Sequence, residues 1–419
     1  MASYRSREVR AVTKDELGDY MGCLRTAFLG EREVTTDEVA WRAPRMDLSR
    51  TFCAFEENRL CGTARTFPAE LTVPGGVITA AAVTEVTVLP THTRRGHLRA
   101  MMRAMLDDAV ERREPMAILT ASEWPIYWRF GFGPASERVS FEVRNADAAF
   151  RETASGTVAI VGIDELRSVA PDVYESIRLG TVGALGRNPS WWDEHLGVDF
   201  EASSPPPKNR VRAVWRDDSG RPRGYVVYDT NPRWTDGSPD GEVFLKELVA
   251  SSPEAHRELW RYLCTLDLVG TVHAAHRPVD EPVAYHLVDG RAVRYRTRFD
   301  HLWVCLLDVQ RCLSARRYSA EGRIVVEIVG AAGHASVELR PRSSRIVLEV
   351  DRGRVSAYPT GEDPDLVVEH VALGAAFLGG TSFAALSVAG RVSEHVAGSV
   401  ARADSMFGVR PAPYLTTNF

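Results

Sequence analysis

The sequence contains few cysteines, and none lie in a pair spaced as zinc ligands usually are. Six cysteines occur among 419 residues, and no two form a C-x-x-C pair. This count and spacing match neither a disulfide framework nor a structural zinc site. We therefore expect reduced, buried thiols, as in cytoplasmic proteins, and no metal site.

Long apolar runs and an excess of basic charge are also missing. The run VALGAAFLGG (371–380) is too short to span a bilayer, and the first ten residues, MASYRSREVR, have no apolar core of the kind found in signal peptides. The formal net charge is −5, which provides no general basic footprint for nucleic acid. We expect a cytoplasmic protein whose partners include neither a membrane nor nucleic acid.

The length predicts two to four domains. A helical pattern covers 14–29, and two strand-like runs then flank a turn at Glu57-Asn58. A strand at 77–89, a helix after Gly96 and a short buried strand at 116–121 follow in order. This order predicts a parallel strand–helix–strand unit.

A weak internal repeat and a change of pattern organise the rest of the chain. The stretch 243–269 again reads as strand, turn and helix, and Glu247 aligns with Glu85. From Tyr295 onward, apolar and polar residues alternate as in half-buried antiparallel strands. The expected strands there are 323–330, 335–341, 345–353 and 365–373, with a helix at 381–390, and loops are expected at 203–209 and 231–242. These features predict a third, α+β domain.

The helix after Gly96 has one apolar face. Its apolar residues follow the spacing of a helix that packs on a sheet, and they are Leu98, Met101, Met102, Met105, Leu106, Ala109 and Val110. We therefore interpret the methionines as core residues and not as a cofactor site.

The turn before this helix, Arg94-Arg95-Gly96, has the chemistry of an anion site. The first N–H groups of a helix have no partner within it, and the helix dipole favours negative charge at that end. Glycine permits close approach of the backbone, and arginine adds charge and donors. The turn fits neither the Walker A nor the Rossmann pattern. On the residues alone, a solvated basic turn remains the alternative.

The strand and turn together resemble a known family. "VTVLPTHTRRGHLR" (86–99) is similar to the V-x-V-x-x-x-x-R-x-x-G pattern of the GCN5-related N-acetyltransferases (GNAT). In that family the strand backbone pairs with the pantetheine arm of acetyl-CoA, and the turn holds its pyrophosphate. The resemblance implies acetyl-CoA as co-substrate. Together with Ser122 and Glu123 at the next strand end, the implied binding residues are Val86, Thr87, Val88, Arg94, Arg95, Gly96, His97, Leu98 and Arg99.

A second match concerns Tyr127. "SEWPIYWRFGFGPAS" (122–136) contains Tyr-x-x-x-Gly-Phe and follows the predicted strand at 116–121, as in those acetyltransferases. A phenol there can protonate the departing thiolate of CoA. A core or interface aromatic is the alternative, and we expect that role for Trp124, Trp128, Phe130 and Phe132.

Over nearly its whole length the chain resembles the Eis-type acetyltransferases, named for enhanced intracellular survival. The resemblance implies a mixed α/β (α+β) fold with two tandem GNAT domains, the second degenerate, and a sterol-carrier-protein-like third domain. The expected boundaries are 1–150, 151–294 and 295–419. The second domain has lost the arginine pair and the glycine of the turn, so it should not bind in the same way. The resemblance also implies a homohexamer.

The resemblance further implies an unusual base, the C-terminal carboxylate, here on Phe419 in the ending PAPYLTTNF. An apolar side chain can anchor such an end, and a carboxylate in a partly apolar site is a better base. The implied mechanism is direct attack of an amine on the thioester, with Tyr127 as proton donor and no metal.

The acceptor stays open among aminoglycoside-like amines, polyamines and lysine side chains of proteins or peptides. An acidic cluster, Glu31, Glu33, Asp37 and Glu38, could attract a polycation, or it could be a solvated helix face. A lipid-binding carrier with a non-catalytic acetyltransferase scaffold is a further alternative. The arginine turn and Tyr127 argue against it, since a scaffold does not need them.

Overall fold

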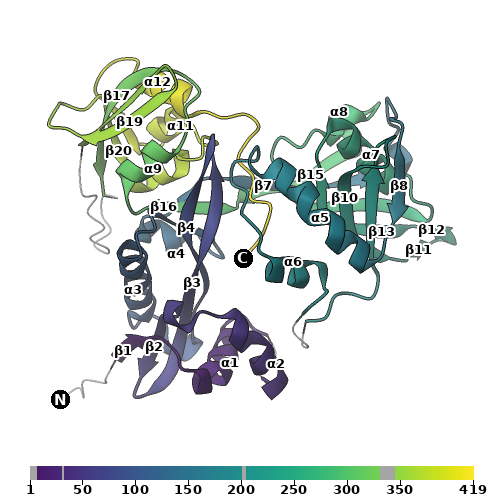
Figure 1. The fold of residues 1–419 in the computed structure, drawn as a ribbon, viewed down its shortest axis with the longest axis horizontal. Helices are drawn as coiled ribbons and strands as arrows, with labels where there is room; N and C mark the ends of the chain where they lie inside the picture. The colour runs from purple at the N-terminus through teal and green to yellow at the C-terminus, as the bar shows by residue number, and fades with distance from the viewer. Residues whose placement is uncertain (1–6, 31–32, 201–203, 331–344) are drawn as a thin grey trace. The chain divides into compact units, whose positions relative to one another are not determined.

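A computed structural model describes residues 7–30, 33–200, 204–330 and 345–419. The chain forms two compact units (Figure 1). The first joins Met1–Ser136 to His301–Phe419, and the second contains Glu137–Phe200 and Ser204–Asp300. The acetyltransferase-like turn and the C-terminal tail therefore belong to the same unit.

The first unit contains a seven-stranded sheet in the order β1-β2-β3-β4-β5-β16-β6. Its strands are β1 (Arg7–Arg10), β2 (Cys53–Glu56), β3 (Arg59–Val73), β4 (Gly76–Val88), β5 (Met116–Thr120), β16 (Leu302–Leu306) and β6 (Gly133–Pro134). Its helices include α1 (Leu17–Ala27), α2 (Thr36–Arg42), α3 (His97–Glu111) and α4 (Trp124–Tyr127). β4 and β5 pair in parallel and are connected by α3, which confirms the predicted strand–helix–strand unit.

Local sequence signals explain much of this sheet. Glu57 and Asn58 both have positive φ, 53° and 60°, as a tight hairpin between β2 and β3 requires. The methionine-rich face of α3 is buried in the core, as predicted, and its buried residues include Met101, Met102 and Met105. Val110, placed on that face by its spacing, is instead exposed near the end of the helix.

A strand from late in the chain completes the first sheet. β16 lies between β5 and β6 and pairs antiparallel with both. Meanwhile β7 (Glu137–Arg144) pairs in the second sheet. The expected domains, 1–150, 151–294 and 295–419, remain a prediction. Strands are exchanged across both boundaries between them, since β7 pairs in the second sheet and β16 in the first.

The second unit repeats the architecture. Its sheet has the order β15-β7-β14-β13-β10-β9-β8. The strands besides β7 are β8 (Thr157–Ile160), β9 (Arg210–Arg216), β10 (Pro222–Asn231), β13 (Gly241–Ala250), β14 (Val269–Arg277) and β15 (Val293–Asp300). The helices are α5 (Ile163–Arg178), α6 (Pro189–Leu196), α7 (Pro253–Cys264) and α8 (Val283–His286). The predicted loop at 231–242 contains a small hairpin of β11 (Trp234–Thr235) and β12 (Ser238–Pro239).

The end of the chain adds a five-stranded sheet to the first unit, in the order β19-β18-β17-β20-β21. The strands are β17 (Gly322–Val329), β18 (Arg345–Asp351), β19 (Arg354–Pro359), β20 (Leu366–Glu369) and β21 (Val392–Glu394). Its helices are α9 (Val309–Ala315), α10 (His370–Ala376), α11 (Phe383–Val388) and α12 (Ser399–Phe407). The helix predicted at 381–390 is confirmed, and the strand predicted at 335–341 lies outside the described residues.

The strand predicted at 365–373 is wrong beyond Glu369. There β20 ends and α10 begins, and all seven residues of α10 are buried. Its small residues allow very close packing on the first sheet. A Cβ on Gly374 would lie 2.5 Å from the Val304 carbonyl oxygen, and one on Gly133 would lie 2.0 Å from that of Val371. Two glycines therefore join the two sheets of the first unit.

A buried arginine ties two helix ends together in this unit. Arg316 is 1% exposed and donates to the Phe377 carbonyl, to the Phe407 carbonyl at 2.8 Å and to the Arg317 carbonyl at 3.1 Å. Phe377 is the C-cap of α10 and Phe407 is the last residue of α12, and at both helix ends the dipole favours a cation. Burial lowers the pKa of Arg316 to about 10, so the side chain is still charged near neutral pH.

Replacing this side chain should destabilise the first unit. Arg316→Met leaves buried carbonyl groups without donors, so we expect a loss of about 3 kcal/mol in the free energy of unfolding. Urea denaturation measures this loss. The exposed neighbour provides a matched control, and Arg317→Met should cost less than about 1 kcal/mol. Equal losses in the two variants would contradict the assignment.

Candidate active site

The parallel strands β4 and β5 separate after a short contact. They pair only through Ala80–Ala82 of β4, although β4 continues to Val88. On its other side, β4 stays paired with β3 as far as Val88. The Leu89 N–H donates to the Cys61 carbonyl, so by the alternation of an antiparallel ladder the Val88 N–H points away from β3, toward the opening. The predicted cofactor strand, Val86–Val88, thus lies where β4 has separated from β5. We call the gap between these two strand ends the slot.

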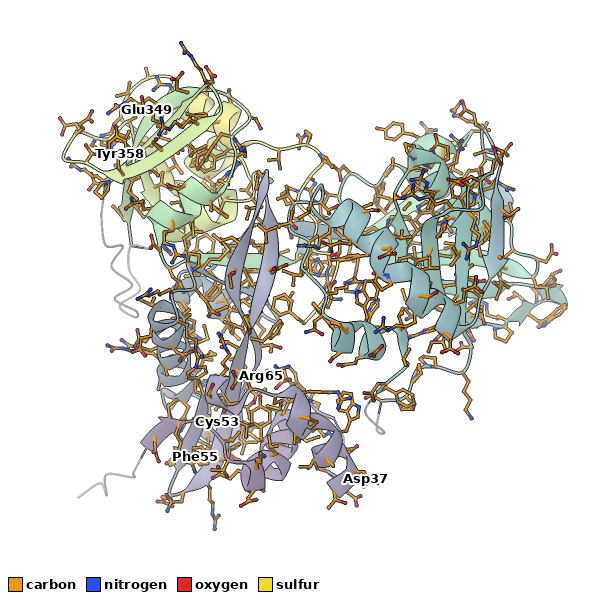
Figure 2. All side chains as sticks on the ribbon, viewed as in Figure 1. Asp37, Cys53, Phe55, Arg65, Glu349 and Tyr358 are labelled. Atoms are coloured by element: carbon orange, nitrogen blue, oxygen red, sulfur yellow. The ribbon has the colours of Figure 1, made fainter. Side chains whose placement is uncertain are left out.

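A bulge at Glu85 accompanies this separation. Glu85 has φ 57°, and the β3–β4 register shifts between Thr63 and Arg65. The Glu85 carboxylate accepts from Tyr20 and Arg42 and pairs with Arg65 at 2.9 Å. Arg65 is labelled in Figure 2. Burial alone would raise its pKa, but the charges of Arg65 and Arg42 lower it to about 2. Glu85 therefore stays ionised and holds α1 and α2 to the bulge.

The turn that follows β4 leads into an uncapped helix. Arg94 and Gly96 have positive φ, 61° and 89°, and Gly96 is the N-cap of α3. No side chain caps this helix, and no acidic residue lies in its first turn. Its first internal hydrogen bond runs from Ala100 to Gly96 at 3.1 Å, so the amides of residues 97–99 precede it. This geometry suits an anion.

The side chains of the turn divide into two groups. Those of Arg94 and Arg99 are exposed. Arg95 donates to the Glu56 carboxylate at 3.1 Å and to the Thr91 carbonyl at 2.8 Å. The His97 ring lies 3.2 Å from the same carboxylate. The side chains of two predicted cofactor residues thus face a protein carboxylate.

Sequence reasoning missed Glu56. It is only 4% exposed, although it ends β2 directly before the hairpin turn. A glutamate next to an exposed turn reads as solvated, and its partners lie about forty residues away. The sequence signal for its burial is its position at the end of the otherwise apolar stretch CAFE (53–56).

Tyr127 lies in the short helix that follows β5. It is 6% exposed, and burial raises its pKa to about 12, while a hydrogen bond with Ser122 partly opposes this and the charge of Glu123 adds to it. Ser122 and Glu123 are themselves exposed at the end of β5. The phenol therefore keeps its proton at neutral pH next to a strand end that borders the slot.

The neighbouring aromatics mostly form core. Phe130 and Phe132 are buried, and Phe132 meets the Tyr127 ring edge-on. Trp128 is half-buried. Trp124 differs, since half of it is exposed while it packs edge-on against Trp303 of β16.

The C-terminal tail packs onto the same sheet. Pro413, Leu415 and Thr417 are buried in alternation, as in an extended segment. The Phe419 ring meets the Phe67 ring edge-on, with 5.6 Å between centroids. Phe67 on β3 pairs with Ala82, the last residue through which β4 contacts β5. The chain end therefore lies beside the point where the two strands separate.

The second unit has a slot of the same origin, but its own side chains occupy it. β13 and β14 pair as far as Leu245, and Arg277 then donates to the Leu248 carbonyl at 3.3 Å and pairs with Glu281 at 2.6 Å. Ser252 caps α7, and Glu254 lies in its first turn. The anion site of the first unit is thus absent from the described residues of the second.

The acidic cluster is smaller than its sequence suggests. Glu38 is buried, since it completes a capping box with Thr35 and pairs with Arg25 at 3.1 Å. Glu33 and Asp37 are exposed, and Glu31 lies outside the described residues. Only two of the four are therefore described as free to face solvent.

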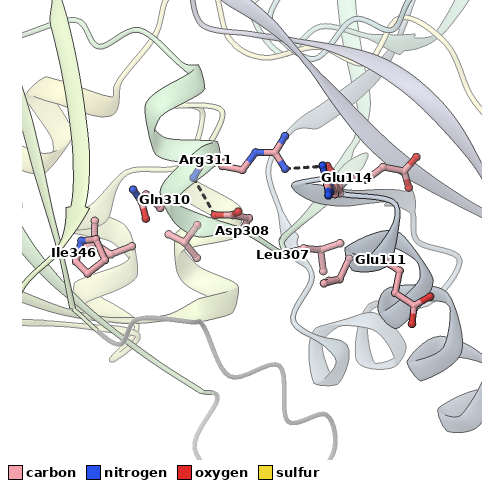
Figure 3. A pocket seen from close by; sticks show the side chains of 11 residues that line it. Glu111, Glu114, Leu307, Asp308, Gln310, Arg311 and Ile346 are labelled. Atoms are coloured by element: carbon pink, nitrogen blue, oxygen red, sulfur yellow. Dashed lines mark hydrogen bonds between the residues drawn. The ribbon is translucent and has the colours of Figure 1, made fainter.

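A pocket of about 530 Å³ opens between the end of α3 and the C-terminal part of the first unit (Figure 3). Charged residues line much of it, namely Glu111, Arg113, Glu114, Asp308 and Arg311. Within it, Arg311 donates to the Arg113 carbonyl at 2.9 Å. Such a lining does not suit the acyl chain of a lipid.

Comparison with known proteins agrees with this geometry. Models described as acetyltransferase (GNAT) domains match residues 8–135 and 183–311, and a sterol carrier protein domain matches 309–416. An uncharacterized N-acetyltransferase of Streptomyces avermitilis is 34% identical over 98% of each chain. The N-acetyltransferase Eis of Mycobacterium tuberculosis is 30% identical over 84% of this chain and 83% of its own.

The chain belongs to the Eis-type N-acetyltransferases. The crystal structure of Eis1 from Mycobacterium abscessus superimposes with a TM-score of 0.82 at 32% identity, covering 98% of this chain and 100% of that one. A GCN5-related N-acetyltransferase from Anabaena variabilis shares the fold, with a TM-score of 0.83 at 16% identity. The predicted fold, two tandem GNAT domains and a sterol-carrier-like domain, is confirmed.

Membership makes this Eis-type chain an acetyltransferase, and the GNAT fold implies acetyl-CoA as co-substrate and an amine as acceptor. In the part of the chain that the structure covers, no helix has both the length and the apolar character to cross a membrane. Nor do three or more His, Cys, Asp or Glu side chains of those residues gather into a group that could hold a metal ion.

Glu56 should matter for acetyl-CoA in this Eis-type enzyme. Glu56→Gln weakens the hold on Arg95 and His97, and a charge-assisted hydrogen bond contributes about 1.5–3 kcal/mol. We expect the KM for acetyl-CoA to rise about tenfold with kcat and the amine KM nearly unchanged. Steady-state kinetics measures this, with the exposed neighbour Glu57→Gln as control. An unchanged KM for acetyl-CoA would refute the role.

Proposed function

We propose that the chain transfers the acetyl group of acetyl-CoA to a primary amine by direct attack. Tyr127 is the proton donor, and the C-terminal carboxylate of Phe419 is the proton acceptor. The observation that carries this proposal is the slot between β4 and β5, which has an uncapped helix start beyond Val88 and Tyr127 at the end of β5.

The binding step uses the strand and the turn. The backbone of Val86–Val88 pairs with the pantetheine arm, and the pyrophosphate lies at the amides of residues 97–99 with the side chains of Arg94 and Arg99. Ser122 and Glu123 border the slot from the end of β5. The outward Val88 N–H donates to the thioester carbonyl and stabilises the negative charge that forms on its oxygen during attack.

Two proton transfers complete the reaction. The Phe419 carboxylate takes a proton from the amine nitrogen as that nitrogen attacks the thioester carbon and the new carbon–nitrogen bond forms. As the carbon–sulfur bond breaks, Tyr127 gives its proton to the thiolate. The raised pKa of Tyr127 supports this role, because the phenol carries its proton throughout the neutral range.

We propose small polyamine-like or aminoglycoside-like amines as acceptors, with lysine side chains of proteins or peptides as the alternative. The family resemblance supports both. We also propose, from the same resemblance, a homohexamer in the cytoplasm. Light scattering coupled to size-exclusion chromatography tests the assembly, and a monomer at micromolar concentration would refute it.

A CoA-release assay tests the function. Aminoglycosides, polyamines and lysine peptides are supplied in parallel, and CoA binding is measured by calorimetry for the wild type and for Arg94→Ala/Arg99→Ala. We expect release with at least one amine class and weaker CoA binding by the double variant. Release with no amine, together with a lipid copurified in stoichiometric amount, would favour the carrier hypothesis.

A further inference from the structure

We propose that His301 is a positioning residue that directs the C-terminal carboxylate through its contact with Asn418. This inference rests on the proposed function, since it concerns the base named there. His301 is 3% exposed, and its ring Nε2 lies 2.7 Å from Asn418 Oδ1. Asn418 directly precedes Phe419, so this contact fixes the residue next to the carboxylate.

The backbone of His301 is itself held firmly. Its N–H donates to the Ser136 carbonyl at 2.9 Å, and the following Leu302 N–H donates to the Ser136 hydroxyl at 3.1 Å. The ring therefore projects from a fixed point at the start of β16. A side chain anchored in this way can restrict the motion of the chain end that it contacts.

Three successive residues of the tail are held by three different contacts. Thr417 is buried, Asn418 contacts the His301 ring, and the Phe419 ring meets Phe67. The Asn418 contact holds the backbone next to the carboxylate, whereas the Phe67 contact holds only the ring of Phe419. Asn418 is exposed, although its side chain contacts the buried His301 ring.

The position of His301 in the sheet places this contact near the proton donor. β16 runs antiparallel to β5, and Leu302 pairs with Thr120. By this register His301 lies across from residue 121, between the end of β5 at Thr120 and Ser122. The start of β16 thus contacts the tail and lies beside the strand end that leads to Tyr127.

The chemistry asks of His301 only that it donate to the Asn418 amide oxygen. A neutral imidazole with its proton on Nε2 makes this bond, and so does the protonated ring. The ring is not needed as a base, because the carboxylate takes the proton. Its effect should appear in kcat, since misplacing a reacting group by about 1 Å can cost about 100-fold.

Four variants test the proposal: His301→Ala, His301→Gln, Asn418→Ala and the double alanine variant. We expect each single alanine variant to lower kcat about 10- to 100-fold, with the acetyl-CoA KM within about twofold of wild type. The double variant should be no slower than the slower single variant. Glutamine can still donate from its amide, so His301→Gln should recover much of kcat. Exposed His395→Ala, from the same unit, is the matched control.

Asn418→Ala keeps the test decisive if His301→Ala does not fold, because Asn418 is exposed. A variant with one residue added after Phe419 separates the two hypotheses. If the added residue abolishes turnover while Asn418→Ala and His301→Gln keep wild-type kcat, this inference fails and the proposed function stands. If the added residue leaves turnover intact, the carboxylate is not the base and both fail.

Discussion

Replacing Tyr127 by Phe is expected to lower kcat about 100-fold or more, with the KM for acetyl-CoA nearly unchanged. General acid catalysis contributes about 10²- to 10⁴-fold, and phenylalanine keeps the ring packing while removing the proton. The buried ring contacts Phe132, a contact that the variant retains. The loss of kcat is measured as the rate of CoA release at saturating amine and acetyl-CoA.

The pH profile adds a second readout for Tyr127. An unperturbed tyrosine has a pKa of about 10, so its ionisation would begin to reduce the rate near about pH 9. Burial raises the pKa of Tyr127 to about 12, so the protonated donor persists through that range. We expect no loss of kcat from this group below about pH 10. Exposed Tyr285→Phe is the control, and a Tyr127→Phe variant with wild-type kcat would remove the tyrosine from the mechanism.

Adding one glycine after Phe419 should also lower kcat about 100-fold or more. The carboxylate then lies one residue, up to about 3.5 Å, beyond its place beside Phe67. Truncation at Asn418 should have a similar effect, because the carboxylate is retained but withdrawn. Since each variant keeps a terminal carboxylate, loss in both would identify its position as the requirement.

Binding measurements separate this loss from damage to the cofactor site. Calorimetry should give an acetyl-CoA affinity within about twofold of wild type for both tail variants, because the Phe419 ring packs on Phe67 of β3 and not on the predicted cofactor strand or turn. A kcat within about twofold of wild type in the extended variant would show that another group takes the proton.

The parts of the fold predicted correctly are those encoded by neighbouring residues. The hairpin at Glu57-Asn58, the buried face of α3 and the strand β5 all follow from spacing within about fifteen residues. The same holds for the turn at Arg94–Gly96. Short-range patterns predict which residues share a face. The structure agrees with them for the buried face of α3, except at Val110 near the end of that helix.

The features that could not be predicted depend on distant partners. Nothing local in LWVCL (302–306) indicates that it enters the first sheet, since any buried strand reads in this way. The sequence predicts a strand through residue 373, into the first turn of α10, because the uniformly buried residues of this helix carry no helical period. Glu56 and His301 gain their roles from Arg95 and Asn418, far away in the sequence. A family resemblance supplied the tail, which composition alone would leave as a frayed end.

The insertion of β16 between β5 and β6 has a consequence for cutting the protein into pieces. A fragment that ended near residue 150 would lack the strand that covers one edge of β5, and would offer the apolar stretch MAILT (116–120) to any other chain. It would also lack His301 and the chain end. Because the first unit draws on both ends of the chain, a fragment that lacks either end would lack part of the proposed site, and an expression library of nested fragments should yield soluble, active protein only near full length.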